Sequence, residues 1–232
     1  MSHQHQHGDA GHAHGLGDAH THDFAAANKA YFDEHAHKLE DMHAGWREMA
    51  RKEVDAMRTQ WPALFDKERT VVLDFACGIG MISEQLVPHV KKIVGVDISQ
   101  VSVDRYNTLA TEKLGLTPET MKAACIELKG EPGELEGTKF DLVVCCASYH
   151  HFASIDDTTH LLASFLKPGG ALLTHHGLVP HRHGIAEAQL RAVFEGAGLG
   201  AFELKDAATQ KLPHDLGGAD TTWFVARGVK PE

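Results

Sequence analysis

The sequence predicts an α/β fold built around a seven-stranded, mostly parallel sheet with an antiparallel edge. From residue 70 onward, five short apolar runs alternate with segments of helical periodicity, which is typical of strand–helix–strand units. The first run ends in a tight turn rich in small residues, 76–80, and a helical pattern follows at once. An open sheet holds a nucleotide-like ligand at such a turn. Two final β-rich runs, 201–205 and 221–227, share a polar, hairpin-like connection, which predicts the antiparallel edge.

The composition indicates one globular domain with additional segments. The chain has 232 residues, of which 43% are hydrophobic and 23% charged, as in ordinary soluble proteins. Its formal net charge of −10 argues against a nucleic-acid partner, because phosphate backbones attract clustered Lys and Arg. No apolar run approaches the roughly 20 residues that span a bilayer, and no secretory signal is visible. We therefore expect a cytoplasmic protein with no membrane partner, whose four cysteines are buried thiols.

The N-terminal segment, residues 1–23, is rich in His and Gly and poor in apolar residues. Such a composition cannot bury enough surface to offset the entropy of ordering, so we expect a disordered tail. Its alternating His-x-His pattern can bind a divalent metal such as Ni, Cu or Zn. This affinity is either incidental or part of a metal-linked role.

Two helices are expected next, over 25–39 and 41–58, and together with the residues up to 64 they form an N-terminal helical segment. An apolar stripe on the second helix indicates one buried face. The segment either packs on the sheet as plain core or caps its carboxyl edge as a lid. A lid would bring aromatic side chains to the ligand, and its candidates are Tyr31, Phe32 and Trp46. Tyr31 is counted among the cofactor-binding candidates.

The main domain is expected over residues 65–232. Its strands are predicted, in chain order, at 70–75, 92–96, 121–127, 140–146, 171–175, 201–205 and 221–227. Its helices are predicted at 79–86, 100–114, 155–166 and 183–197. A Lys-Pro-Gly-Gly turn at 167–170 leads into the fifth strand.

The glycine turn and an acid after the second strand predict an adenosine-like ligand. Gly78 and Gly80 allow backbone amides to approach a ligand, and Asp74 can orient the turn or accept from a cationic amino group. Asp97 follows the second strand, where a carboxylate accepts hydrogen bonds from a ribose diol. The alternative is that Asp97 merely caps a helix. The turn matches neither the dinucleotide G-x-G-x-x-G pattern nor a P-loop.

The segment after the fourth strand contains candidate catalytic side chains. His150 or His151 is predicted as a general base with a pKa suited to neutral pH, and Tyr149 is predicted to position or stack on a substrate. The alternative is that these histidines only hydrogen-bond the loop. Cys145 and Cys146 suggest thiol or metalloid chemistry. The simpler interpretation is that both are strand residues and that one of them lines the ligand pocket.

Histidines also follow the fifth strand, at His175, His176, His181 and His183. Imidazole suits Zn, Cu, Fe and Ni, so a metal site at this edge is conceivable. No H-x-x-x-H pattern or carboxylate partner fixes its geometry, and we assign no residue as a metal ligand.

Four motifs, at 73–80, 95–99, 140–144 and 166–170, together resemble the ordered motif set of class I S-adenosylmethionine-dependent methyltransferases. The resemblance covers about residues 65–228 and is closest to small-molecule enzymes of the ubiquinone-biosynthesis-like and fungal secondary-metabolite type. It implies a Rossmann-like sheet with strand order 3-2-1-4-5-7-6, strand 7 antiparallel, helices on both faces and S-adenosylmethionine as the cofactor.

The resemblance also implies a set of cofactor contacts. The methionine part would be surrounded by Asp74, Ala76, Gly78 and Gly80. The adenosine part would be held by Asp97, Ile98, Ile126 and Glu127. Cys145 or Cys146 would be the cofactor contact at the end of strand four. The chain departs from the family at Ala76, where glycine is usual, and at Glu127, where Asp is commoner.

The resemblance implies methyl transfer to an O, N or S nucleophile of a small molecule by in-line displacement, for which alignment supplies most of the catalysis. The Asn/Asp-Pro-Pro-Tyr motif of amino-group and nucleobase enzymes is missing after strand four, which favours a small-molecule acceptor. Two alternatives remain. One is a thiol, metalloid or metal-associated methyltransferase. The other is a non-catalytic regulatory protein of the same fold that binds cofactor and metal.

Overall fold

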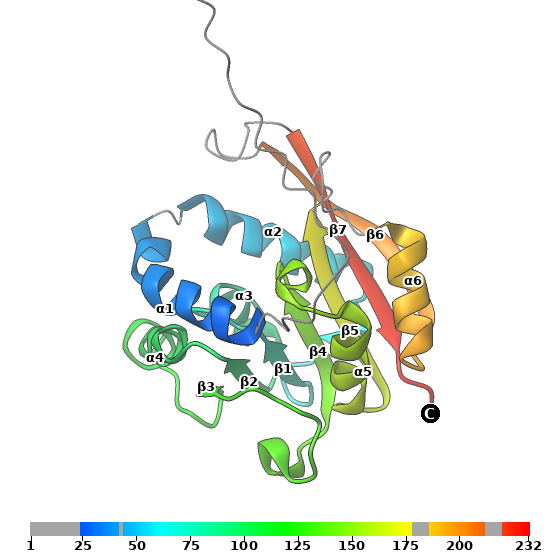
Figure 1. Ribbon diagram of the computed structural model, residues 1–232, viewed down its shortest axis with the longest axis horizontal. Coiled ribbons are helices and arrows are strands. Elements are labelled where there is room, and N and C mark those ends of the chain that lie inside the picture. The colour runs from blue at the N-terminus through cyan, green and yellow to red at the C-terminus, as the bar shows by residue number, and fades with distance from the viewer. Residues whose placement is uncertain (1–23, 42–43, 178–185, 212–219) are drawn as a thin grey trace, which may run out of the picture.

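A computed structural model describes residues 24–41, 44–177, 186–211 and 220–232. Within them the chain forms one seven-stranded sheet of order β3-β2-β1-β4-β5-β7-β6 (Figure 1). The strands are β1 Val71–Phe75, β2 Lys92–Asp97, β3 Met121–Cys125, β4 Phe140–Cys146, β5 Leu166–Gly177, β6 Gly200–Lys211 and β7 Asp220–Val229. The predicted fold class and strand order are confirmed.

The pairing of the strands brings several loops to one edge of the sheet. β1 pairs in parallel with β2 and β4, so that Asp74 lies opposite both Gly95 and Val144. β3 and β5 continue the parallel pairing on either side. β7 runs antiparallel between β5 and β6, as predicted for the terminal pair. The carboxyl ends of β1 to β5 therefore meet at one edge, where ligands bind in folds of this kind.

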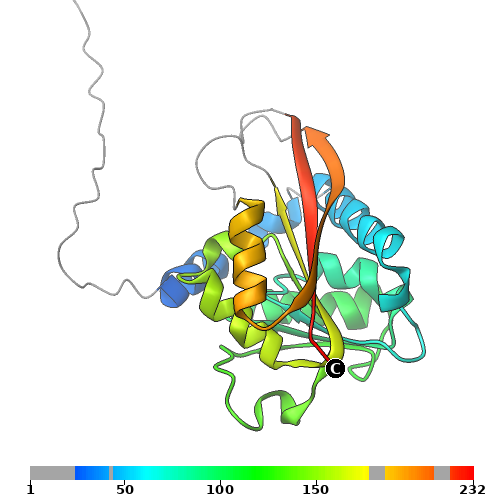
Figure 2. The same ribbon diagram turned by 90° about the vertical axis from the view of Figure 1, so that its right-hand side faces the viewer.

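Helices cover both faces of the sheet (Figure 2). They are α1 Phe24–Asp41, α2 Ala44–Gln60, α3 Met81–Leu86, α4 Gln100–Thr108, α5 Ile155–Ser164 and α6 Glu187–Gly196, with a π-helical turn at Leu109–Lys113 and 3-10 turns at Pro62–Leu64, Val87–His89, Glu134–Gly137 and Tyr149–His151. On one face, α5 and α6 pack Leu162 and Phe194 against the strands. On the other, α2 packs Val54 and Met57 against β1, β4 and β5. The second N-terminal helix is thus a structural part of the core.

Most element boundaries agree with the prediction, and the differences described here follow from pairing with other segments of the chain. β3 ends at Cys125, earlier than predicted, because its only neighbour β2 ends at the paired residue Asp97. β5 begins at Leu166, before the expected turn at 167–170, because Leu166 pairs with Phe140 of β4. Gly169 and Gly170 continue the strand by exchanging backbone hydrogen bonds of 2.9 and 2.8 Å with Lys230 near the C-terminus. α6 begins at Glu187, and the residues 178–185 before it lie outside the described part of the chain.

The tail at 1–23 also lies outside the described residues, and so do His181 and His183 after β5. Among the helices that are described, none has the length and apolar content needed to cross a membrane.

Candidate active site

A cavity of about 270 Å³ lies at the carboxyl edge of the sheet, between the strand ends and the two N-terminal helices. It is lined by the residues that follow β1, β2, β3 and β4 and by one side each of α1 and α2. The sequence-predicted candidates among its lining residues are Asp74, Ala76, Gly78, Asp97, Ile98, Ile126, Glu127, Cys146 and His151. The glycine turn and the acid at the end of β2, which were predicted to form one ligand site, therefore lie in the same cavity.

The turn after β1 has the backbone geometry that its glycines suggest. Gly78 has φ +51°, and a Cβ built on it would meet no atom within 4 Å, so its backbone faces open space. Ala76 also has positive φ, +56°, a conformation that is uncommon for a residue with a Cβ. This is the position at which the resemblance expects glycine. Gly80 points the other way, since a Cβ there would lie 2.8 Å from the ring of Tyr106.

Asp97 ties the end of β2 to the turn after β1. Its Oδ2 accepts a hydrogen bond from the backbone N–H of Gly78 at 2.9 Å, and its Oδ1 accepts one from the N–H of Ser99 at 2.9 Å. Each carboxylate oxygen has a second lone pair, which leaves capacity to accept from a ligand diol. Burial raises the pKa of Asp97, and these backbone hydrogen bonds oppose the shift.

Asp74 is almost fully buried at the end of β1, with 2% of its surface exposed. Ser83 of α3 donates a hydrogen bond to its Oδ2 at 2.6 Å, and Tyr106 of α4 in turn donates to Ser83 at 2.8 Å. Burial raises the pKa of Asp74 to about 7, although the Ser83 hydrogen bond lowers it. The carboxyl group is thus poised to change its ionisation when a cationic ligand approaches.

The segment after β4 brings His151 to the cavity, together with Cys146 and Ser148. His151 is half-buried, and desolvation followed by the charge of His150 lowers its pKa to about 4. The imidazole is therefore neutral at physiological pH and a weaker base than the sequence analysis expected. Ala147 beside it has φ +52°, so strained backbone occurs at the ends of both β1 and β4.

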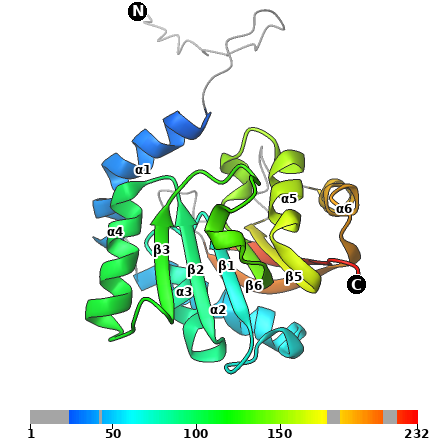
Figure 3. The same ribbon diagram turned by 90° about the horizontal axis from the view of Figure 1, so that it is seen from below.

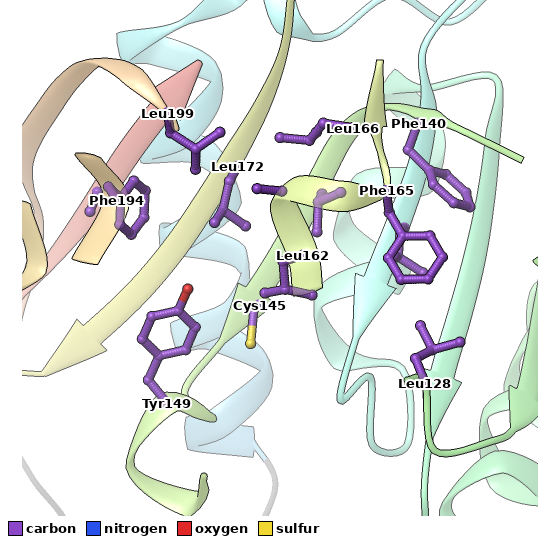
Figure 4. Packing of buried hydrophobic residues seen from close by; sticks show 14 of the residues in the cluster. Leu128, Phe140, Cys145, Tyr149, Leu162, Phe165, Leu166, Leu172, Phe194 and Leu199 are labelled. Atoms are coloured by element: carbon purple, nitrogen blue, oxygen red, sulfur yellow. The ribbon is translucent and has the colours of Figure 1, made fainter. Parts of the chain in front are cut away.

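Other predicted site residues lie away from the cavity. Tyr149 and Cys145 are both fully buried and lie in the apolar cluster between the sheet and α5 (Figure 4). The hydroxyl of Tyr149 is 2.9 Å from the hydroxyl of Thr159, and burial raises its pKa. His150 is exposed outside the lining, and Tyr31 is 55% exposed. Their positions give no support to the roles predicted for them.

The two N-terminal helices close the cavity on the side opposite the strand ends. α1 lies beside α4 (Figures 1 and 3) and contributes Asn28 and Phe32 to the lining. α2 contributes Trp46, Met49 and Glu53, which share one side of the helix at spacings of three and four residues. Of the expected lid aromatics, Phe32 and Trp46 thus reach the cavity.

The lining carries only acidic charge among the residues that the structure describes. It contains four carboxylates and no Lys or Arg, and the four are Glu53, Asp74, Asp97 and Glu127. Burial raises the pKa of Glu53 to about 8. A cavity of this composition suits a ligand with positive charge and disfavours an anionic one.

Sequence reasoning missed several residues of this site. Ser83 and Tyr106 support Asp74 from neighbouring helices, and no local pattern marks them. Glu53 carried a signal, because it is the one acid on the otherwise apolar side of α2 formed with Trp46 and Met49. Within the described residues, no group of three or more His, Cys, Asp or Glu side chains could hold a metal ion.

Comparison with known proteins identifies a known domain within this fold. A family model described as a methyltransferase domain matches residues 73–172, which run from β1 into β5 and include the glycine turn and Asp97. Residues 73–172 therefore form a methyltransferase domain. An uncharacterised methyltransferase of Schizosaccharomyces pombe is 35% identical in an alignment of 155 residues, which covers 57% of this chain and 54% of that protein.

A second curated relative is a ubiquinone biosynthesis O-methyltransferase of Pseudoalteromonas translucida. It is 28% identical over 118 residues, 50% of this chain and 46% of the relative. The chain thus spans about half the length of the curated relatives it matches. The crystal structure of magnesium protoporphyrin IX methyltransferase from Synechocystis PCC 6803 with bound SAM has the same fold as this methyltransferase domain, with a TM-score of 0.66 and 18% identity over 92% of this chain and 100% of that one.

Proposed function

We propose that this protein transfers a methyl group from S-adenosylmethionine to a small-molecule acceptor. The observation that carries the proposal is the convergence of the glycine turn with Asp74 and Asp97 in one cavity at the carboxyl edge of β1 and β2. The match of residues 73–172 to a methyltransferase domain supports it.

The residues present fit this cofactor in charge and in shape. S-adenosylmethionine carries a sulfonium and an ammonium group, and the described lining offers carboxylates without a competing cation. The backbone at Gly78 faces open space, where the methionine part can approach it. Asp97 has acceptor capacity for the ribose hydroxyls, and Ile98 and Ile126 provide apolar surface for the adenine.

The role of the protein in this reaction is to bind, align and exclude water. When bound, the cofactor supplies an activated methyl group on its sulfonium. Asp74 would hold the ammonium end of the cofactor, and Asp97 would hold its ribose. In-line displacement then depends mainly on alignment of the acceptor, which can provide several orders of magnitude in rate.

We further infer that residues 24–64 act as a lid over residues 65–232. α1 contacts the loops after both β2 and β4, and α2 supplies Trp46 and Met49 to the cavity wall. α2 also packs on the sheet, so the movable part would be α1. Lids of this kind exclude water from the transferring group.

Calorimetric titration with S-adenosylhomocysteine tests the proposal directly. The wild-type protein should bind, and Asp97→Ala should weaken binding by about 10-fold or more, because a charged hydrogen-bond acceptor contributes about 1.5–3 kcal/mol. Asp104→Ala is the matched control, since Asp104 is an exposed acid on the same strand–helix unit. If the wild type does not bind, or if Asp97→Ala binds as well as the control, the assignment of this cavity to the cofactor is wrong.

A further inference from the structure

Glu53 is a buried acid that the cofactor contacts proposed above do not use. It lies on α2, lines the cavity and is only 2% exposed. Its neighbours on the same side of the helix, Trp46 and Met49, are apolar. A carboxyl group in such surroundings costs free energy unless it has a partner or a function.

The partners of Glu53 come from the ends of two strands. Its Oε2 lies 3.3 Å from Nδ1 of His175, which is itself fully buried at the end of β5. The His175 ring stacks on Trp223 of β7, with ring centroids 4.9 Å apart and an interplanar angle of 16°. Cys146 at the end of β4 is close enough for Glu53 to raise the pKa of its thiol, after the larger effect of burial.

These contacts place Glu53 on the side of the cavity away from the adenosine candidates. Ile98 and Ile126 follow β2 and β3, whereas Glu53 faces the ends of β4 and β5, and β1 lies between the two groups. If the cofactor lies across β1, β2 and β3, then Glu53 is next to the space left for the acceptor.

We propose that Glu53 is a catalytic residue, the proton acceptor for a neutral methyl acceptor that is methylated on a hydroxyl group. The inference rests on the proposed methyl transfer and extends it to the chemistry of the acceptor. In the step, the acceptor oxygen forms a bond to the methyl carbon while the bond from that carbon to the cofactor sulfur breaks. The hydroxyl proton passes to Oε of Glu53, which changes from carboxylate to carboxylic acid, and the sulfonium becomes a neutral thioether.

The lining of the cavity selects the class of acceptor. Among the described lining residues there is no Lys or Arg, so a phosphate or carboxylate on the acceptor would find no cationic partner there. Aromatic and thioether side chains make up much of the remaining wall, among them Phe32, Trp46, Met49 and Phe152. A neutral phenol has both the apolar surface for this wall and a hydroxyl proton that must be lost during attack.

The ionisation of Glu53 is matched to this role. Burial raises its pKa to about 8, close to the operating pH at which a general base is most effective. Among the described residues, the titratable groups that face it are His175 from β5 and Cys146 from β4. The rate should therefore rise with pH and level off above about 8.

A pair of isosteric acceptors, phenol and thiophenol, tests the proposal with labelled S-adenosylmethionine. Thiophenol is already ionised at pH 8 and needs no base, whereas phenol is not. We expect Glu53→Gln to lower kcat/KM for phenol by about 100-fold or more and for thiophenol by less than about 5-fold. With saturating S-adenosylmethionine, the variant should also lose the pH dependence seen with phenol. Glu48→Gln, an exposed change on the same helix, should alter neither activity.

Two further measurements make the test decisive. S-adenosylhomocysteine should bind Glu53→Gln and the wild type with equal affinity, and an infrared band of a protonated carboxyl group should titrate near pH 8 in the wild type and be missing from the variant. Equal losses with both acceptors, a 10-fold weaker affinity for S-adenosylhomocysteine, or unchanged phenol methylation would each overturn the role of Glu53. A wild type that binds S-adenosylhomocysteine but methylates neither acceptor overturns the acceptor class, whereas failure to bind overturns the proposed function itself.

Discussion

The hydroxyl group of Ser99 donates a hydrogen bond to Oδ1 of Asp33 at 2.6 Å, which ties α1 to the N-terminus of α4. A second tie joins the same helix to the loop after β4, where Asn28 Nδ2 donates to the carbonyl oxygen of His151 at 2.6 Å. Ser99 follows β2, and His151 follows β4. The first helix therefore bridges strand ends on both sides of β1 and covers the cavity between them.

Loss of these two ties should open the cavity without unfolding the domain. We expect the double variant Asn28→Ala/Asp33→Ala to weaken S-adenosylhomocysteine binding by about 5-fold or more, because each hydrogen bond contributes roughly 1 kcal/mol to the closed state. Amide hydrogen exchange over 24–41 should accelerate. Glu34→Ala, an exposed change on the same helix, is the control. Unchanged exchange and affinity in the double variant would show that α1 is not held by these contacts.

The raised pKa of Asp74 predicts a pH dependence of cofactor binding. Its carboxyl group has a pKa of about 7 in the free protein, so it is mostly neutral below that pH and ionised above it. Only the ionised form attracts an ammonium group, so affinity for S-adenosylhomocysteine should fall by up to about tenfold per pH unit below 7 and level off above it. Calorimetry from acid to neutral pH measures this curve. Asp74→Asn should bind weakly at every pH, and a variant that kept the wild-type curve would exclude Asp74 as its origin.

The hydrogen bond from Ser83 should set the midpoint of that curve. Ser83 donates to Asp74 and so lowers its pKa, in opposition to burial. Ser83→Ala should move the midpoint of the affinity curve to higher pH, which leaves affinity at high pH nearly unchanged. Tyr106→Phe removes only the hydrogen bond from Tyr106 to Ser83, which does not contact Asp74 directly, and should shift the midpoint less. A shift toward lower pH in Ser83→Ala would contradict this account.

The fold could be predicted from the sequence because its determinants are local or periodic. Apolar runs of strand length, helical periodicity between them and the final hairpin-like pair were sufficient for the class, and the ordered motifs implied the strand order. The predicted strand boundaries were wrong where pairing with a distant segment determines them. β5 extends into the predicted turn because Gly169 and Gly170 pair with Lys230, far along the chain.

The site was predictable where the backbone alone determines position. Asp74 and Asp97 lie at the ends of β1 and β2, Gly78 lies in the turn after β1, and a parallel sheet brings such residues to one edge. The direction of side chains in the loop after β4 depends on packing instead. Tyr149 turns into the apolar cluster under α5, while His151 turns into the cavity, and no sequence pattern distinguishes them. The position of Glu53 in the cavity could not be predicted, because the sequence does not show which side of α2 faces the sheet.

Burial of Glu53 should also be visible in the stability of the protein. Its pKa is raised from 4.5 to about 8 in the folded state, so the folded protein binds the proton more tightly than the unfolded chain does. This favours the folded state at low pH, and the contribution is lost as pH rises from 4.5 to about 8. Relative to Glu53→Gln, the free energy of unfolding of the wild type should fall by about 1.4 kcal/mol per pH unit in that window. Denaturant titrations at several pH values measure it, and a difference that does not change with pH would mean that Glu53 is not held in a desolvated site.

The packing behind the glycine turn should tolerate no added methyl group at Gly95 of β2. A Cβ there would lie 2.9 Å from Sγ of Cys77, 3.0 Å from Cβ of Ala123 and 3.0 Å from the ring of Tyr106, so neighbouring atoms must move. Gly95→Ala should lower the free energy of unfolding by about 1–3 kcal/mol, as overpacked cores do. Because Tyr106 supports Ser83 and Asp74, affinity for S-adenosylhomocysteine should fall as well.

Gly196 of α6 provides the matched control for that substitution. No atom lies within 4 Å of a Cβ built on it, and it ends a helix in which alanine is favoured. Gly196→Ala should raise the free energy of unfolding by up to about 1 kcal/mol and leave S-adenosylhomocysteine binding unchanged. Denaturant unfolding and calorimetry of the two variants separate the effect of packing at Gly95 from that of a glycine replacement in general. Equal stability changes at both positions would mean that the ring of Tyr106 is not fixed against β2.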